Sequence, residues 1–229
     1  MKIGGFQKQS LIDYPGKVAS IIFTVGCNFR CPFCHNYELL CTGKAEEFDQ
    51  EKILDYFKQN KNLLDGVVVT GGEPTLHEDL TEFIKKIKKL GLLVKLDTNG
   101  TNFEVLQKLI KEGLVDFVAI DVKNSLDFGK YNKTVGNVLT KEQFENVKKS
   151  LELIKGSGVE YEFRTTISKE LHSEKDILQL CQDIKPAKHY SIQNFRQDNV
   201  LKTFNSFSEE EMVRLVEKCS SFIDSVSHR

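Results

Sequence analysis

The stretch GCNFRCPFCHN, residues 26–36, contains three of the six cysteines, Cys27, Cys31 and Cys34, within eight residues. It directly follows the apolar and β-branched run VASIIFT, residues 18–24, which predicts a buried strand. In parallel α/β folds the loops after the strands carry the active site, because the carboxyl ends of the strands meet at one edge of the sheet. We therefore expect the cysteine stretch to carry the chemistry of this protein.

Five further strand candidates follow this first strand and alternate with amphipathic helical segments. The strand candidates are GVVVT (66–70), LLVKLDT (92–98), VDFVAID (115–121), VEYEFRTTI (159–167) and KHYSIQNF (188–195), and the helical segments begin at Asp49, His77, Phe103, Lys141, Ser173 and Ser208. The last helix opens with a serine cap followed by acidic residues. The alternation predicts an α/β fold with a parallel sheet, built as one domain of six βα units over residues 1–229.

Several predicted strands have one polar face. Side chains alternate along a strand, so Glu160, Glu162, Arg164 and Thr166 share one face, as do Phe117, Ala119, Asp121 and Lys123, and also Lys95, Asp97 and Asn99. If the apolar faces pack against helices, the polar faces point into the interior, where unpaired charge costs several kcal/mol. A polar ligand in the interior explains this pattern, and the alternative is that these faces contact water.

Composition excludes several classes of protein. The 229 residues have 40% hydrophobic and 28% charged residues, and no apolar run approaches the ~18 residues of a membrane-spanning helix. The first residues lack the layout of a secretory signal, so we expect a cytoplasmic protein that does not bind membranes. With 32 basic and 33 acidic residues the net charge is -1, which argues against nucleic acid as a main partner.

The spacing of the cysteines indicates a metal centre and argues against a disulfide framework. Soft thiolates clustered on one loop suit an iron-sulfur cluster with one iron left open, while the alternative is a zinc site that adds His35 to the three cysteines. Cys181 and Cys219 are predicted to be buried thiols on helices. The role of Cys41 stays open.

These motifs together resemble the radical S-adenosylmethionine superfamily, whose signature is CxxxCxφC after the first strand, with Phe33 here at the aromatic position. The resemblance covers essentially the whole chain and implies a partial (β/α)6 barrel. It implies a 4Fe-4S cluster held by Cys27, Cys31 and Cys34, with the fourth iron chelating the amino and carboxylate groups of S-adenosylmethionine. Gly71-Gly72-Glu73-Pro74 matches the family's GGEP turn, where Glu73 and the backbone approach the methionyl ammonium.

A narrower resemblance is to the activating enzymes of glycyl-radical proteins. Residues 97–100 read DTNG as in that group, and residues 121–123 read DVK where the group has DLK. The resemblance implies the cofactor-binding residues Phe33, Asn36, Gly71, Gly72, Glu73, Asp97, Asn99, Lys123, Arg164 and Gln193, with Lys123 and Arg164 near the carboxylate and ribose. Asp97, Thr98, the Ala119 carbonyl and Asp121 would hold a monovalent cation. The alternative for the charged residues is a structural network of salt bridges.

Within this group, residues 10–36 (SLIDYPGKVASIIFTVGCNFRCPFCHN) most resemble the activating proteins of anaerobic ribonucleoside-triphosphate reductase. The resemblance implies an oxidoreductase that takes one electron from a donor such as flavodoxin or ferredoxin and cleaves S-adenosylmethionine to methionine and a 5'-deoxyadenosyl radical. That radical removes a hydrogen atom from a glycine of the reductase, and no residue of this chain is assigned as a catalytic acid or base.

Two other functions remain open. One is a radical enzyme that acts on another glycyl-radical enzyme or on a small molecule. The other is a zinc or iron-sulfur electron-transfer module without enzymatic activity. Gly72, Glu73, Asp97 and Arg164 argue against the module, because a metal scaffold has no use for a pocket that binds an ammonium and a carboxylate.

Overall fold

The computed structural model describes residues 1–40, 47–198, 200 and 202–229. The chain packs into two compact units. Unit 1 comprises Met1–Asn28, Glu38–Thr98 and Asn102–Val118, and unit 2 comprises Phe29–Tyr37, Asn99–Thr101 and Ala119–Arg229. The single domain expected over residues 1–229 stays a prediction. Cys41 lies outside the described residues.

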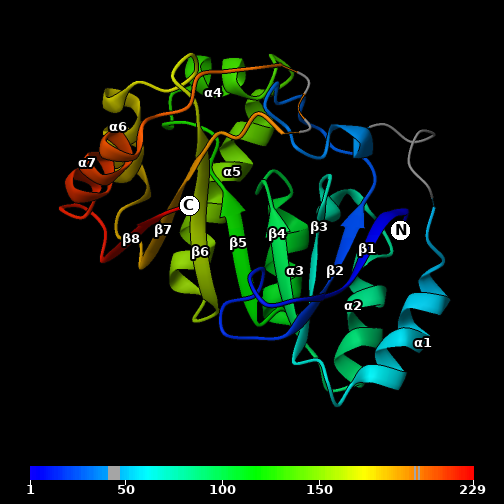
Figure 1. Ribbon diagram of the computed structural model, residues 1–229. Coiled ribbons are helices and arrows are strands. Elements are labelled where there is room, and N and C mark those ends of the chain that lie inside the picture. The colour runs from blue at the N-terminus through cyan, green and yellow to red at the C-terminus, as the bar shows by residue number, and fades with distance from the viewer. Residues whose placement is uncertain (41–46, 199, 201) are drawn as a thin grey trace. The chain divides into compact units, whose positions relative to one another are not determined.

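Unit 1 is built on a sheet whose strands follow the order of the chain (Figure 1). Its strands are β1 (Ile3–Ser10), β2 (Ala19–Thr24), β3 (Gly66–Gly71) and β4 (Leu93–Thr98), and its helices are α1 (Gln50–Asn60), α2 (Leu80–Lys89) and α3 (Phe103–Lys111). β2, β3 and β4 are parallel, with Ala19 opposite Gly66 and Gly66 opposite Leu93, and β1 is antiparallel to β2. The short 3-10 helix η2 (Pro74–Leu76) follows β3, and another, η1 (Tyr37–Leu39), follows the cysteine stretch.

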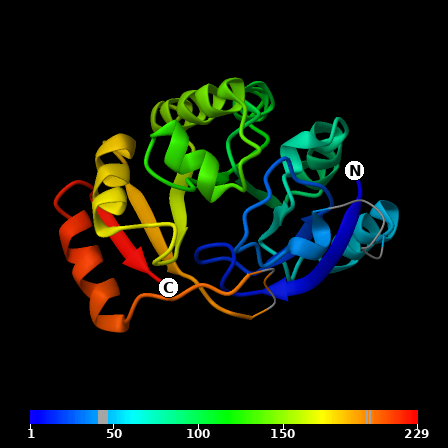
Figure 2. The same cartoon turned by 90° about the horizontal axis from the view of Figure 1, so that it is seen from above.

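In unit 2, three parallel strands pair in the order of the chain. Its strands β6 (Glu160–Ile167), β7 (His189–Asn194) and β8 (Ser225–His228) pair in chain order, with Phe163 opposite Tyr190 and His189 opposite Ser225. Its helices are α4 (Phe128–Thr134), α5 (Lys141–Gly156), α6 (Glu174–Ile184) and α7 (Glu209–Cys219). Figure 2 shows α6 beside α7, and α7 packs on β8. The strand β5 (Phe117–Asp121) begins at the end of unit 1 and continues into unit 2.

Local sequence signals explain where the long helices begin. Thr140 with Gln143, Ser173 with Asp176 and Ser208 with Glu211 form capping boxes in front of α5, α6 and α7. In each box the side chain of one residue accepts a hydrogen bond from the backbone of the other, which satisfies two backbone N–H groups that the helix leaves free. The helix starts predicted at Lys141, Ser173 and Ser208 are confirmed to within one residue.

All six predicted strands are present, and the described residues contain two more strands, β1 and β8, and one more α-helix, α4. β1 has two glycines and the polar run Gln7–Lys8–Gln9, so it lacks the apolar alternation of a strand and forms by pairing with β2. β8 is only four residues long, and α4 is only seven residues long without an apolar stripe. These three elements depend on tertiary pairing and packing, which a local pattern does not encode.

Each unit has a core of strand and helix side chains. In unit 1, Val67 and Val69 of β3 and Leu96 of β4 are completely buried, as are Ile84 and Ile87 of α2. In unit 2 the core includes Cys181 of α6 and Cys219 of α7, both completely buried, which confirms that these two thiols are buried on helices. Among the described residues, no helix combines the length and the apolar character that crossing a membrane requires.

Candidate functional site

In unit 1, the start of the cysteine loop and the GGEP turn are held side by side by their backbones. The N–H of Gly72 donates to the carbonyl of Thr24 (2.8 Å), and the N–H of Glu73 donates to the carbonyl of Gly26 (2.8 Å). A Cβ atom on Gly72 would lie 2.0 Å from the Gly26 carbonyl oxygen. Gly71 has a φ of +111°, a conformation that favours glycine. The glycines were predicted to let the backbone come close to the cofactor. In the structure they also let the GGEP turn pack closely against the start of the cysteine loop.

The variant Gly72→Ala is expected to destabilise the protein by about 1–3 kcal/mol, the usual effect of forcing extra atoms into a packed site. A backbone atom meets the new methyl group, so the loop itself has to shift. Gly156→Ala is the matched control, because no atom lies within 4 Å of the methyl group it adds at the end of α5. Urea unfolding measures both, and equal stability of the two variants would contradict the close packing of the two loops.

Glu73 is almost completely buried, and its carboxylate holds the turn together. Its Oε1 accepts hydrogen bonds from the Thr75 N–H (3.1 Å), the Thr75 hydroxyl (2.6 Å) and the Thr98 hydroxyl (2.7 Å). The carboxylate thus caps η2 and ties the GGEP turn to the end of β4. Thr98 was predicted as a cation ligand, and in the structure its hydroxyl serves this anchoring bond.

The polar face of β4 is buried. Lys95 Nζ lies 2.6 Å from Asp97 Oδ1, and the two side chains are only 2% and 12% exposed. The Lys95 ammonium also lies 5.7 Å from the centre of the Phe117 ring, a cation–π contact. At this strand the alternative that the polar face contacts water is wrong. Sequence reasoning did not select Lys95, although strand alternation had already placed it on the face of Asp97.

In unit 2, the middle of the cysteine loop is shaped by the turn that follows α4. The N–H of Arg30 donates to the Val135 carbonyl (2.9 Å), and a Cβ on Gly136 would lie 2.3 Å from the Arg30 carbonyl oxygen. The Phe29 ring meets the buried Tyr131 ring edge-on, with centroids 6.4 Å apart. The unpredicted helix α4 therefore supports the loop that carries Cys31 and Cys34.

The thiols of this loop are soft metal donors, and both burial and nearby polar groups act on them. Cys31 is buried, and the N–H of Cys34 donates to its carbonyl (3.1 Å). Burial raises the pKa of the Cys34 thiol, while the backbone N–H of Asn36 and the nearby Lys123 ammonium oppose this rise. Three thiols within eight residues fit the donor set of an iron-sulfur cluster.

The metal ligands remain predictions. Cys27 belongs to unit 1, while Cys31 and Cys34 belong to unit 2, and the four residues of the predicted cation site divide in the same way. Among the residues that the structure describes, no three His, Cys, Asp or Glu side chains form a group that would hold a metal ion. Nδ1 of His35, the residue of the zinc alternative, lies 3.1 Å from the Asp198 carbonyl oxygen.

Asp121 lies between two cations at the end of β5. Arg164 Nε donates to Asp121 Oδ1 (2.8 Å), and Lys123 Nζ donates to Asp121 Oδ2 (3.1 Å). Burial alone would raise the pKa of Asp121, but the Arg164 and Lys123 charges lower it well below its usual range. The pKa of Lys123 is raised, because the attraction of Asp121 outweighs the effect of burial. β5 ends at Asp121, where the predicted strand 115–121 also ends, so Lys123, which the alternation placed on the face of Asp121, lies two residues beyond the strand.

The remaining predicted cofactor residues have varied surroundings. Gln193 of β7 accepts a hydrogen bond from the Thr166 hydroxyl (3.2 Å), and the Asn99 side chain accepts from the Thr101 N–H (3.0 Å). Phe33 is buried and Asn36 is half-buried, while Ala119 is completely buried in β5. The structure adds two buried polar residues, Asn124 and His172, which lie near Lys123. No sequence motif had singled out either of them.

Fold and site together define a class of α/β protein. A cysteine-rich loop follows the first parallel strand, a glycine turn packs against the start of that loop, and Asp121 binds two cations at the end of β5. The family model of the radical SAM superfamily matches residues 21–184. The chain therefore belongs to the radical SAM superfamily, and it is a radical SAM enzyme.

Two relatives match much of the chain. One, from Methanocaldococcus jannaschii, bears a name that places it among glycyl-radical enzyme activating enzymes, and it is 36% identical over 98% of this chain and 94% of its own length. The other is a pyruvate formate-lyase-activating enzyme of Clostridium pasteurianum, 30% identical over 82% of this chain and 78% of its own length.

A solved structure shows the same fold. SuiB of Streptococcus suis, bound to S-adenosylmethionine, superposes with a TM-score of 0.70 at 15% identity, over 91% of this chain and 49% of that one. The prediction of an α/β fold of the radical SAM type is thus confirmed. Membership of the family also implies a 4Fe-4S cluster and S-adenosylmethionine as cofactors.

Proposed function

We propose that this protein activates a glycyl-radical enzyme, and that its partner is an anaerobic ribonucleoside-triphosphate reductase. The observation that carries the first part is the 36% identity, over nearly the full length of both chains, to the relative from Methanocaldococcus jannaschii. The choice of the reductase rests on residues 10–36, whose LIDYPG and CNFRCPFCHN segments resemble the activating proteins of that enzyme. A carrier such as flavodoxin or ferredoxin would deliver the electron.

In this proposal Cys27, Cys31 and Cys34 hold the 4Fe-4S cluster. The bound cluster supplies the electron that cleaves S-adenosylmethionine to methionine and a 5'-deoxyadenosyl radical. Lys123 and Arg164 offer two cationic groups to the cofactor's carboxylate and ribose. Because both already contact Asp121, their charges are held in place before the cofactor arrives.

In unit 1, the GGEP turn would receive the methionyl ammonium. Glu73 keeps this turn in shape through its bonds to Thr75 and Thr98. Its carboxylate therefore supports the binding loop, and its negative charge attracts the ammonium. Asp97, paired with Lys95, is proposed to act in the same region. Asn99, Gln193, Phe33 and Asn36 complete the proposed cofactor-binding set, and a monovalent cation at Asp97, Thr98, Ala119 and Asp121 is proposed as well.

The experiment that tests the function is formation of a radical on the partner. Anaerobically reconstituted protein, reduced and given S-adenosylmethionine, is expected to produce a glycyl radical in the reductase, observed by electron paramagnetic resonance. Glycine suits this role because it lets the backbone approach closely, and the flanking peptide groups delocalise a radical on its Cα atom. Replacing that glycine with alanine in the partner should remove the signal, while 5'-deoxyadenosine still forms.

A second candidate partner is pyruvate formate-lyase, which the 30% identity to the activating enzyme of Clostridium pasteurianum favours. A radical on pyruvate formate-lyase and none on the reductase would move the assignment to this candidate. If neither protein gains a radical while a small metabolite stimulates turnover, the enzyme acts on a small molecule and the proposal is wrong.

A further inference from the structure

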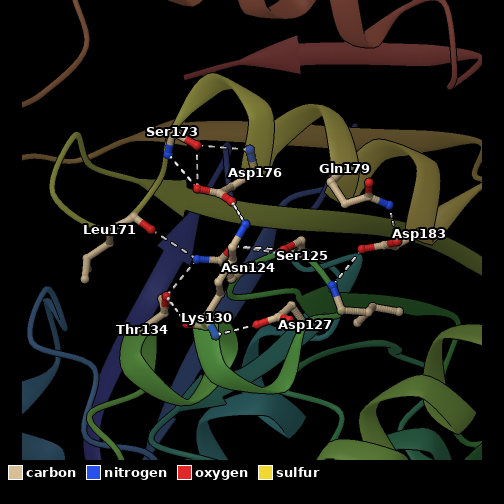
Figure 3. Close-up of polar contacts among 11 residues, drawn as sticks. Asn124, Ser125, Asp127, Lys130, Thr134, Leu171, Ser173, Asp176, Gln179 and Asp183 are labelled. Carbon is tan, nitrogen blue, oxygen red and sulfur yellow. Dashed lines mark hydrogen bonds and ion pairs between the residues drawn. The ribbon is translucent and has the colours of Figure 1, made fainter.

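The loop after β5, residues 123–127, is fixed by buried polar contacts (Figure 3). The Asn124 side chain is 1% exposed, and its Nδ2 donates to the Thr134 hydroxyl of α4 (2.9 Å) and to the Leu171 carbonyl (3.1 Å). Its Oδ1 accepts from the Ser125 N–H (2.8 Å). One buried amide therefore joins this loop to α4 and to the connection between β6 and α6.

A second contact holds the end of the loop. Asp183 of α6 accepts a hydrogen bond from the Leu126 N–H (2.6 Å), and Gln179 donates to the other oxygen of the same carboxylate (2.9 Å; Figure 3). A hydrogen bond to a charged acceptor is stronger than one between neutral groups. The loop is thus fixed at residues 124–126 by side chains that do not themselves belong to the predicted cofactor site.

The third contact is made by His172 to the backbone of Lys123, a predicted cofactor residue. His172 is 2% exposed, its Nδ1 lies 3.2 Å from the Ser168 N–H, and its Nε2 lies 2.8 Å from the Lys123 carbonyl oxygen. A backbone N–H can only donate, so Nδ1 is the acceptor and Nε2 carries the proton that is donated to Lys123. Burial lowers the pKa of His172, which favours this neutral form; the charged groups that act on it are Asp176 and Lys123.

We propose that His172 is a positioning residue for Lys123. The bond from His172 fixes the Lys123 backbone on one side, and the bond from Lys123 Nζ to Asp121 fixes the side chain on the other. A lysine side chain has many rotamers, so a lysine on a mobile backbone loses more entropy when it binds an anion. His172 therefore raises the affinity for the carboxylate of S-adenosylmethionine without touching it. This inference rests on the proposed function, since it takes Lys123 to contact the cofactor.

Two variants of His172 separate positioning from general packing. His172→Gln keeps a donor where Nε2 stands, while His172→Asn keeps an acceptor for Ser168 but is too short to reach the Lys123 carbonyl. We expect His172→Asn to weaken S-adenosylmethionine binding about tenfold, the loss of roughly one hydrogen bond, and His172→Gln to stay within about twofold. Equilibrium dialysis of the reconstituted protein measures binding, and thermal unfolding reports the fold of each variant.

A double-mutant cycle with Lys123→Met gives the decisive comparison. If His172 acts through Lys123, His172→Asn changes the affinity by less than about twofold once Lys123 is methionine. The same tenfold loss in both backgrounds, or equal losses for His172→Gln and His172→Asn, would overturn the inference while leaving the proposed function intact. If Lys123→Met itself leaves binding unchanged, both the inference and the assignment of Lys123 to the cofactor site are wrong.

Discussion

Replacing any one of Cys27, Cys31 and Cys34 with alanine is expected to abolish cluster binding. Wild-type protein reconstituted without oxygen should hold about four irons and four sulfides per chain, and each variant should hold almost none. The physical reason is that three thiolates are the whole protein ligand set of such a cluster, and two of them leave two irons without a protein ligand. Iron and sulfide analysis with visible absorption measures the loss.

The other cysteines and His35 provide controls for this prediction. Cys181→Ala and Cys219→Ala should keep full iron content, since both thiols are completely buried on α6 and α7 and contact each other. His35→Ala should also keep it. A variant of the triplet that retains its iron, or a protein that takes up one zinc in place of iron and loses it in His35→Ala, would show that the cluster assignment is wrong.

The sequence predicts the parallel sheet well because its signals are local. β-branched runs such as Val67–Val69 and the caps at Ser173 and Ser208 determine structure within a few residues. β1 was not predicted, because its glycines and polar residues form a strand only through pairing with β2. α4 escapes because seven residues without an apolar stripe form a stable helix only against neighbours such as Phe144.

Motifs predict which residues matter at the site, while their partners require the structure. The GGEP motif singles out Glu73, but only the structure shows that one of its oxygens receives three hydrogen bonds from Thr75 and Thr98. Thr75 had a local signal, since a carboxylate two residues before a backbone N–H commonly caps a turn. His172 had none, because it lies 49 residues from Lys123 in the sequence and an isolated histidine carries no pattern.

The variant Asp121→Ala is expected to cost about 2–3 kcal/mol of stability, somewhat less than the roughly 3–5 kcal/mol for breaking a completely buried ion pair. The Asp121 side chain is 30% exposed, whereas Lys123 and Arg164 are only 15% and 12% exposed. Without the carboxylate, both largely buried cations lose their bond to Asp121, and Arg164 Nη1 still lies 3.9 Å from Glu162 Oε1. For a chain of this size, the midpoint of thermal unfolding should fall by about 4–12 °C.

The control is Asp55→Ala, which removes the partner of Lys58 from an ion pair on α1 whose side chains are 61% and 59% exposed, and it should change the stability by less than about 0.5 kcal/mol. Asp121→Asn separates charge from shape, because the amide keeps the size of the side chain while the carboxylate charge is lost. If Asp121→Asn is as stable as the wild type, the charge of Asp121 does not decide the stability of this site.

The pH dependence of the Asp121→Asn penalty tests the cause directly. The pKa of Asp121 is lower in the folded protein than the ordinary value of about 3.9, so the unfolded chain binds the proton more readily. The carboxylate therefore contributes its full stability above about pH 4, and this contribution is lost as the pH falls toward the folded-state pKa. The difference between wild type and Asp121→Asn should stay constant from about pH 8 to 5 and shrink below about pH 4. A difference that is constant down to the acid limit of folding would mean that Asp121 acts through packing, and that Lys123 and Arg164 do not depend on its charge.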